Sequence, residues 1–271
     1  MTPWLNVPIE RPDASARLLC IPYAGGGASA YRGWARFVPP EVELCAVQPP
    51  GRENRFTEPP LRTIREIADG IADALACEAD DRPLIVFGHS MGALVAFELA
   101  RVLRARGAAM PLLLILSGHV APHLAPHRPP IYDLPEREFL ARIRIMEGTP
   151  AAVFEQRELL DFYLPVLRAD FTACDTYVCA PEPPLAMPFL VLAGDADATM
   201  PVEDVAAWSG HTTAEYALRV IPGGHFFPQT ARDAVLREIA SAIASIDFKA
   251  RPGDGARPKT QEEIVHGRSN C

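Results

Sequence analysis

Apolar residues along the chain fall into two alternating patterns. Short continuous apolar runs are typical of strands that are buried on both faces, and apolar residues at helical spacing are typical of amphipathic helices. The predicted strands are 16–23, 42–48, 84–88, 111–118, 188–195 and 216–225. The predicted helices are 30–38, 64–79, 91–107, 202–208 and 229–246. This alternation predicts an α/β fold with a mostly parallel central sheet flanked by helices.

The alternation is interrupted once, over residues 121–187. Proline-rich segments stand at both ends of this stretch, and two or three amphipathic helices are predicted between about 135 and 177, with no strand pattern. We therefore expect a core formed by 1–120 and 188–246, with 121–187 inserted as a helical lid. Residues 247–271 are polar and rich in Pro and Gly, which predicts a disordered tail.

Composition narrows the class of protein. With 49% hydrophobic and 22% charged residues, the 271-residue chain can form a full core. Its net charge of -8 argues against a nucleic-acid binder, which needs a basic face. No apolar run approaches the ~20 residues that span a bilayer, the N-terminus lacks a signal-peptide pattern, and the six cysteines form no Cys-x-x-Cys pair. We expect a cytoplasmic protein with reduced thiols, no membrane association and, by default, a monomer.

The most informative motif is Gly88-His-Ser90-Met-Gly92, which joins a predicted strand to a predicted helix. Gly-x-Ser-x-Gly in this context is the nucleophile elbow of α/β-hydrolases. The turn strains the serine backbone and requires small residues at Gly88 and Gly92. The N-terminus of the following helix stabilises negative charge at the same place. An incidental serine in a Gly-rich turn is the alternative, and the strand-to-helix context argues against it.

A nucleophilic serine needs a base, and the base needs an acid that orients it. In this fold the chain order is Ser, then Asp or Glu, then His. His225 follows the last predicted strand, and Asp195 and Asp197 follow the strand before it. We predict a triad of Ser90, Asp197 and His225, because in this fold the acid commonly lies three residues after the strand-end glycine. Asp195 is then expected to brace the loop.

The oxyanion hole requires two N–H donors. We predict Met91, which follows the nucleophile, and Ala24 in the glycine-rich loop after the first strand, with Gly25 as the alternative for the second donor. The same loop resembles a phosphate cradle, but it lacks the P-loop and dinucleotide patterns, so no cofactor is expected.

Histidines elsewhere in the chain suggest a metal site only superficially. His119, His123 and His127 are spaced four apart, but Pro122 and Pro126 interrupt any helix there, and no carboxylate or cysteine completes a ligand set. We predict no metal and expect these histidines at the surface or at a lid hinge.

Several segments together resemble the type II thioesterases of polyketide and nonribosomal peptide biosynthesis, over nearly all of residues 17–245. The elbow indicates only the superfamily, whereas Pro50–Glu53 (PGRE) and Leu167–Phe171 (LRADF) are narrower signals. Tyr23 and Ala198 depart from the residues that are frequent in the family. The other matching segments are IPYAGGGASAYRGW, AVQPPGRENRF, VFGHSMGALVAFELAR, LSGHVAPH, LAGDADATMP and IPGGHFF.

This resemblance implies an enzyme that removes wrong or stalled acyl or aminoacyl groups from the phosphopantetheine arm of a carrier protein. An acidic carrier would require local basic residues, and Arg52, Arg128, Arg137, Arg142 and Arg144 are the candidates. The lid would shape the acyl pocket. Its apolar residues Phe139, Leu140, Ile143, Met146, Phe154 and Phe162 are candidates for the pocket wall, although most are expected to pack the lid, and Met91 is a further candidate.

Two other readings remain open from the residues alone. One is a different serine α/β-hydrolase, either a small-molecule esterase or an acyltransferase. The other is a non-catalytic scaffold on the same fold, which the presence of all three triad residue types argues against.

Overall fold

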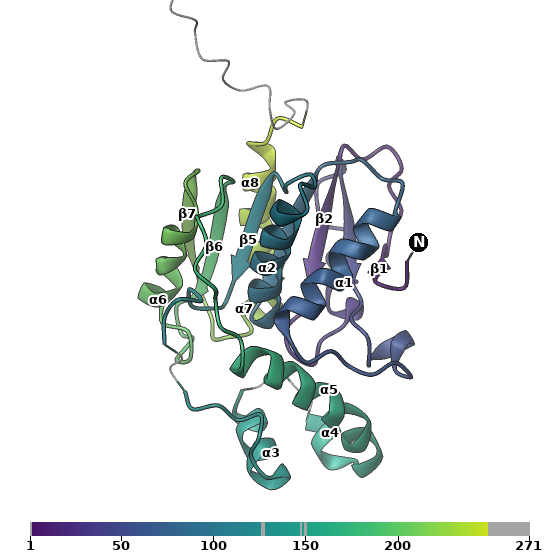
Figure 1. The fold of residues 1–271 in the computed structure, drawn as a ribbon, viewed down its shortest axis with the longest axis vertical. Helices are drawn as coiled ribbons and strands as arrows, with labels where there is room; N and C mark the ends of the chain where they lie inside the picture. Colours follow the sequence, from purple (N-terminus) through teal and green to yellow (C-terminus); the bar gives the residue numbers. More distant parts are fainter. Residues whose placement is uncertain (1, 126–127, 147, 149–150, 249–271) are drawn as a thin grey trace, which may run out of the picture.

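The computed structural model describes residues 2–125, 128–146, 148 and 151–248. Within them, seven strands form one sheet in the order β1-β3-β2-β4-β5-β6-β7 (Figure 1). Every neighbouring pair is parallel except β1 and β3. The strands are β1 Leu5–Asn6, β2 Ala16–Ile21, β3 Val42–Val47, β4 Leu84–His89, β5 Leu113–Ser117, β6 Phe189–Gly194 and β7 Tyr216–Ile221. The predicted α/β-hydrolase sheet is therefore confirmed.

Helices cover both faces of this sheet. The central strands are apolar at consecutive positions, so both faces of the sheet are apolar and each must be covered by helices. In Figure 1, α1 and α2 lie in front of the sheet and α8 lies behind it. The helices of the core are α1 Ile64–Cys77, α2 Met91–Ala105, α6 Val202–Ala206, α7 Phe227–Thr230 and α8 Arg232–Ala244, with short 3₁₀ segments η1 Ala28–Tyr31, η2 Glu53–Arg55 and η3 Ala207–His211.

Three helices lie beyond the carboxyl ends of the strands. They are α3 Glu136–Ile145, α4 Ala151–Glu155 and α5 Arg157–Asp175, and they gather below the sheet in Figure 1. These helices fall within the segment that the sequence predicts as a lid. Their own small cluster holds Ile131, Phe139, Ile143 and Leu167.

Three sequence predictions are wrong in detail. Residues 30–38 do not form a regular helix: η1 is followed by consecutive turns around Gly33, with i+3 bonds such as Trp34 N–H to the Tyr31 carbonyl. The last strand ends at Ile221 because the Gly223–Gly224 turn follows. The predicted helix 229–246 is two helices, broken at Ala231, where φ is -119° and ψ is 36°. The predicted tail from 249 onward lies outside the described residues.

Candidate active site

Ser90 occupies a sharp turn between β4 and α2. Its backbone has φ 56° and ψ -118°, a conformation that is strained for a residue with a side chain. The two flanking glycines explain how the chain makes this turn. A methyl group on Gly88 would overlap the Gly92 backbone, and one on Gly92 would overlap the Ile21 carbonyl. The Ser90 N–H donates to the Ser117 carbonyl of β5 at 2.8 Å, so the elbow is tied to the next strand.

The structure brings Ser90, Asp197 and His225 together, although they follow three different strands, β4, β6 and β7. The His225 Nε2 atom lies 2.9 Å from the Ser90 Oγ atom. The His225 Nδ1 atom lies 2.6 Å from the Asp197 Oδ2 atom. Because the carboxyl ends of parallel strands meet at one edge, residues separated by 135 positions form a continuous hydrogen-bonded row.

The second oxygen of Asp197 is also held. Its Oδ1 atom accepts hydrogen bonds from the Thr199 N–H at 2.9 Å, the Thr199 hydroxyl at 2.7 Å and the Met200 N–H at 3.1 Å. Burial disfavours the charge on this carboxyl, but the hydrogen bonds from His225 and Thr199 outweigh burial and lower the pKa of Asp197 below its usual value. Asp197 is thus a fixed anion beside the imidazole.

Asp195 lies elsewhere in the same loop. Its Oδ1 atom accepts from the Gly223 N–H at 2.8 Å, and so it joins the end of β6 to the turn that carries His225. Of the two predicted acids, only Asp197 contacts the imidazole in the described structure, and Asp195 braces the loop as expected.

The two predicted oxyanion donors belong to different elements. Met91 is the first residue of α2, and Ala24 follows β2 in the glycine-rich loop. The alternative donor, Gly25, has its N–H engaged by the Asp170 carboxylate at 2.7 Å. This contact favours Ala24 over Gly25 as the donor from this loop.

Sequence reasoning missed the connection that this contact reveals. Asp170 of α5 and Arg52 form a buried, bidentate ion pair, with distances of 2.6 and 2.8 Å. Arg52 is only 4% exposed, so its predicted place on a docking surface is wrong. The two narrow family segments, PGRE and LRADF, contain these residues and were the available signal.

Most of the predicted pocket-wall residues pack within the lid. Phe139 and Ile143 are buried, with Leu140, Met146 and Phe154 against them. Phe162 is 44% exposed and faces Phe56, with ring centroids 5.8 Å apart. Five of these six side chains therefore pack against other residues of the segment 121–187, and Phe162 lies against Phe56 of the preceding segment.

His89 lies beneath the triad rather than in it. Its Nδ1 atom is 3.1 Å from the Ser117 hydroxyl, and its ring centroid is 5.2 Å from that of His225. Burial, followed by the neighbouring His225, lowers the pKa of His89 well below its usual value, so the imidazole is neutral.

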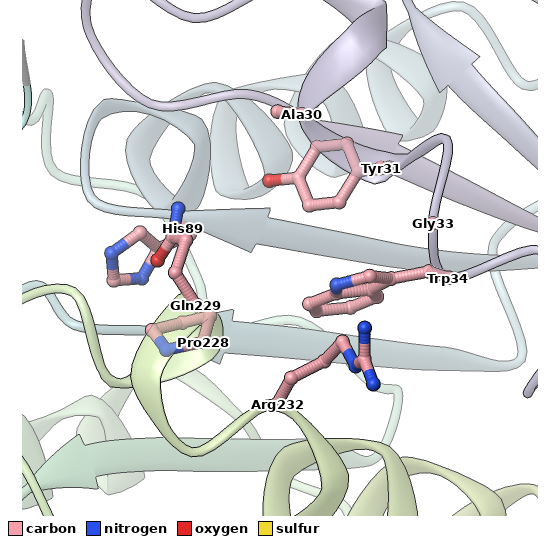
Figure 2. A pocket seen from close by; sticks show the side chains of 8 residues that line it. All are labelled: Ala30, Tyr31, Gly33, Trp34, His89, Pro228, Gln229 and Arg232. Atoms are coloured by element: carbon pink, nitrogen blue, oxygen red, sulfur yellow. The ribbon is translucent and has the colours of Figure 1, made fainter. Parts of the chain in front are cut away.

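A cavity of about 200 Å³ adjoins His89 on the α8 side of the sheet (Figure 2). In Figure 2, the rings of Tyr31 and Trp34 lie across the cavity from His89, Pro228 and Gln229. The His89 Nε2 atom is buried without a hydrogen-bond partner among the described residues. The cavity is lined by Ala30, Tyr31, Gly33, Trp34, His89, Pro228, Gln229 and Arg232, and not by the triad.

The histidines that suggested a metal site are separated. The His123 Nδ1 atom lies 2.8 Å from the His211 Nε2 atom, and His119 contacts the Val120 carbonyl. His127 lies outside the described residues. In the part of the chain that the structure describes, no three or more His, Cys, Asp or Glu side chains are grouped as a metal site. The described helices include none with the length and apolar character needed to cross a membrane.

Comparison with known proteins points to one family. A family model described as "Thioesterase domain" matches residues 16–243. The chain is 41% identical to thioesterase PikA5 of Streptomyces venezuelae, over 83% of this chain and 79% of the relative. It is 39% identical to a Brevibacillus parabrevis protein named linear gramicidin dehydrogenase LgrE, over 89% of this chain and 93% of the relative.

Among solved structures, the thioesterase RedJ from the prodiginine biosynthetic pathway of Streptomyces coelicolor is similar. It superimposes with a TM-score of 0.79 at 40% identity, over 86% of this chain and 87% of the RedJ chain.

Proposed function

The chain belongs to the thioesterase domain family, and on that premise we propose that it hydrolyses acyl or aminoacyl thioesters carried on the phosphopantetheine arm of a carrier protein. The observation that carries this proposal is the hydrogen-bonded row Ser90–His225–Asp197 on the strained elbow. Such a row is suited to acyl transfer through a covalent intermediate.

In the first step, the Ser90 Oγ atom attacks the thioester carbonyl while the His225 Nε2 atom accepts its proton. Asp197 keeps the imidazole in the tautomer with a proton on Nδ1 and stabilises the imidazolium that forms. The N–H groups of Met91 and Ala24 stabilise the oxyanion. The carbon–sulfur bond then breaks, His225 returns its proton to the pantetheine thiolate, and the acyl group remains on Ser90.

In the second step, water enters from the side that the thiol has left. The His225 Nε2 atom takes a proton from this water, and the hydroxide adds to the acyl carbonyl. The oxyanion collapses, the bond to Ser90 breaks, and His225 gives the proton to the Ser90 oxygen. The products are a carboxylic acid and a carrier with a free thiol, which is the outcome that an editing enzyme requires.

The carrier is proposed to dock beside the lid. Arg137, Arg142 and Arg144 are exposed on α3, whereas Arg128 is engaged by the nearly buried Asp175 at 2.7 Å. The two glutamates of α3, Glu136 and Glu138, lie in its first turn, so the positive charge of this helix is concentrated at its end, on Arg142 and Arg144, where an acidic carrier would be attracted. Charge reversal of the three arginines should raise KM for the loaded carrier and leave KM for a small thioester unchanged.

A dehydrogenase reaction, which the name of the gramicidin relative states for that protein, would have to use a dinucleotide bound at the glycine-rich loop, and the contacts of this loop argue against one. Dinucleotide phosphates bind free N–H groups at the start of a long helix. Here the Gly25 N–H donates to the Asp170 carboxylate, and the loop continues into the four-residue η1. A carboxylate at this place would repel a phosphate.

The test is intact-mass spectrometry of an acyl-loaded carrier incubated with the wild-type enzyme, with Ser90→Ala, and with Ser245→Ala as a control. Ser245 follows α8, and its hydroxyl donates to the Ala242 carbonyl of that helix at 2.7 Å. Loss of the acyl mass with wild type and Ser245→Ala but not Ser90→Ala, and faster than from acyl coenzyme A, supports the proposal. Rapid cleavage of a simple ester with an untouched carrier identifies a general esterase instead, and no cleavage of any substrate identifies a scaffold.

A further inference from the structure

A buried ion pair joins the lid to the glycine-rich loop beside Ser90. Asp170 of α5 is fully buried, and its Oδ2 atom accepts from both the Arg52 guanidinium at 2.6 Å and the Gly25 N–H at 2.7 Å. The Oδ1 atom accepts from the second arm of Arg52 at 2.8 Å. We propose that Asp170 is a positioning residue for the oxyanion hole, held in place by Arg52.

The contact acts on the peptide next to the proposed donor. The Gly25 N–H belongs to the peptide group that joins Ala24 to Gly25. When Asp170 holds this peptide, it fixes the backbone on one side of Ala24, and the Ala24 N–H loses much of its freedom to turn away from Ser90. Gly25 has φ +80°, a conformation that glycine adopts without steric cost, so the loop turns at the residue whose N–H Asp170 holds.

Helix α5 supports the loop by shape as well as by charge. A methyl group placed on Gly25 would lie 2.8 Å from the Leu167 Cδ2 atom, so Leu167, one turn before Asp170, packs directly on the loop backbone. On the other side, Arg52 donates to the Gly26 carbonyl at 3.1 Å. The loop is therefore clamped between α5 and the segment that contains Arg52.

Stability alone does not explain such a pair. A buried ion pair gains little over well-packed apolar residues, because removing two charges from water is costly. Its advantage is geometric: the planar guanidinium fixes both carboxylate oxygens, and one of them is then directed at the Gly25 N–H. The oxyanion hole is thus complete only when α5 of the lid is seated on the core.

This inference rests on the proposed function, because it presumes an oxyanion at Ser90. The substitution Asp170→Asn keeps the size of the side chain but removes the charge. Asn has one acceptor oxygen in place of two, and its NH2 group would face one arm of the Arg52 guanidinium, so the two-pronged contact that fixes the side chain is lost. Asp175→Asn is the matched control. Asp175 also lies on α5, is also nearly buried, and also accepts from an arginine and from backbone N–H groups, those of Ile131 and Tyr132, but it does not touch the loop.

Two readouts separate positioning from stability. The first is steady-state kinetics with an acyl thioester. Since a displacement of about 1 Å costs roughly a hundredfold in rate, Asp170→Asn should lower kcat about tenfold to a hundredfold with little change in KM. Asp175→Asn should change kcat less than threefold. Arg52→Lys keeps the charge but loses the planar guanidinium that binds both carboxylate oxygens, so its kcat should lie between those of the two Asn variants. It replaces Asp170→Asn in the test if that variant does not fold.

The second readout uses a trifluoromethyl ketone with an acyl chain. The Ser90 oxygen adds to the ketone carbonyl carbon and forms a hemiketal. The pKa of the hemiketal hydroxyl, which becomes the oxyanion, is measured by ¹³C NMR. A well-placed oxyanion hole lowers that pKa, so Asp170→Asn should raise it relative to wild type and Asp175→Asn should not. Equal hemiketal pKa values and equal kcat values in the two variants overturn the inference. If wild type neither hydrolyses the thioester nor forms the hemiketal, the proposed function fails instead.

Discussion

The elbow that carries Ser90 and the segment 121–187, the proposed lid, are built in opposite ways. Every residue of α2 from Met91 to Leu103 is buried, and the β4 strand before it is buried from Ile85 onward. Helix α3 of the lid buries only Phe139 and Ile143. The proposed nucleophile therefore lies where the backbone is packed on all sides, whereas α3 of the proposed lid depends on a few specific contacts.

Because of this difference, substitutions in the two regions should have different effects. Changes at the elbow and the triad should remove activity or unfold the whole domain. Changes in the lid should act locally, on the exposure of the lid backbone and on substrate turnover. Four predictions test the contrast.

The largest effect is expected in the triad. Asp197→Asn should lower kcat by about 10⁴-fold, because the amide no longer holds His225 in the correct tautomer or stabilises its cation. The measurement is single-turnover hydrolysis of an acyl thioester. Asp195→Asn provides the control, because Asp195 contacts the Gly223 N–H and not His225, and it should cost less than tenfold. The reverse ranking of the two variants would exclude Asp197 as the orienting acid.

The next effect concerns folding of the elbow. Gly88→Ala places a methyl group on the Gly92 backbone, which cannot move without displacing α2, and should cost more than about 4 kcal/mol in the free energy of unfolding. Gly33→Ala has open space and should change stability by less than about 1 kcal/mol. Urea denaturation followed by circular dichroism measures both values. Equal midpoints for the two variants would contradict the close approach of β4 and α2.

The prediction of the elbow and of a Ser90–Asp197–His225 triad was possible from the sequence because each depends on local signals. A serine between two glycines at a strand-to-helix junction requires the strained turn, and residues that directly follow parallel strands must meet at one edge. The choice of Asp197 over Asp195 came from spacing and resemblance. In the structure the His225 Nδ1 atom lies 2.6 Å from Asp197, whereas Asp195 accepts from the Gly223 N–H.

The sequence could not predict the features that depend on distant partners. Asp170 and Arg52 are 118 positions apart, and neither local sequence indicates that the two charges pair with each other. Arg52 consequently read as a surface residue. The strand β1, Leu5–Asn6, is too short to leave a pattern, and the turns after η1 kept an apolar spacing that resembles a helix although Gly33 interrupts it.

The third prediction moves to the lid. Phe139→Ala removes a fully buried ring from the lid cluster and should cost roughly 3 kcal/mol. Because the cluster is separate from the two large cores, the loss should appear as faster hydrogen exchange in α3 and α5, with the main unfolding transition nearly unchanged. Ile145→Ala on the same helix is the control, since Ile145 is 77% exposed. A matching drop in the main transition would show that lid and core unfold as one unit.

The smallest effect concerns acid, at the contact between the start of the lid segment and the core. Burial first, and then His123 and Arg101, lower the pKa of His211 to about 4. The ring of His211 packs against Phe97, with centroids 5.1 Å apart, and its Nε2 atom lies 2.8 Å from His123. Since an unfolded histidine titrates near 6.5, the unfolded chain binds one more proton than the folded chain between these two values. The stability that neutral His211 contributes is therefore present above about pH 6.5 and is lost as the pH falls toward 4.

The test is urea denaturation at pH 7 and at pH 5. The free energy of unfolding should decrease between these two pH values by on the order of 1 kcal/mol more in wild type than in His211→Gln. An identical decrease in the two proteins would mean that His211 titrates normally and that this side of the lid is open to water.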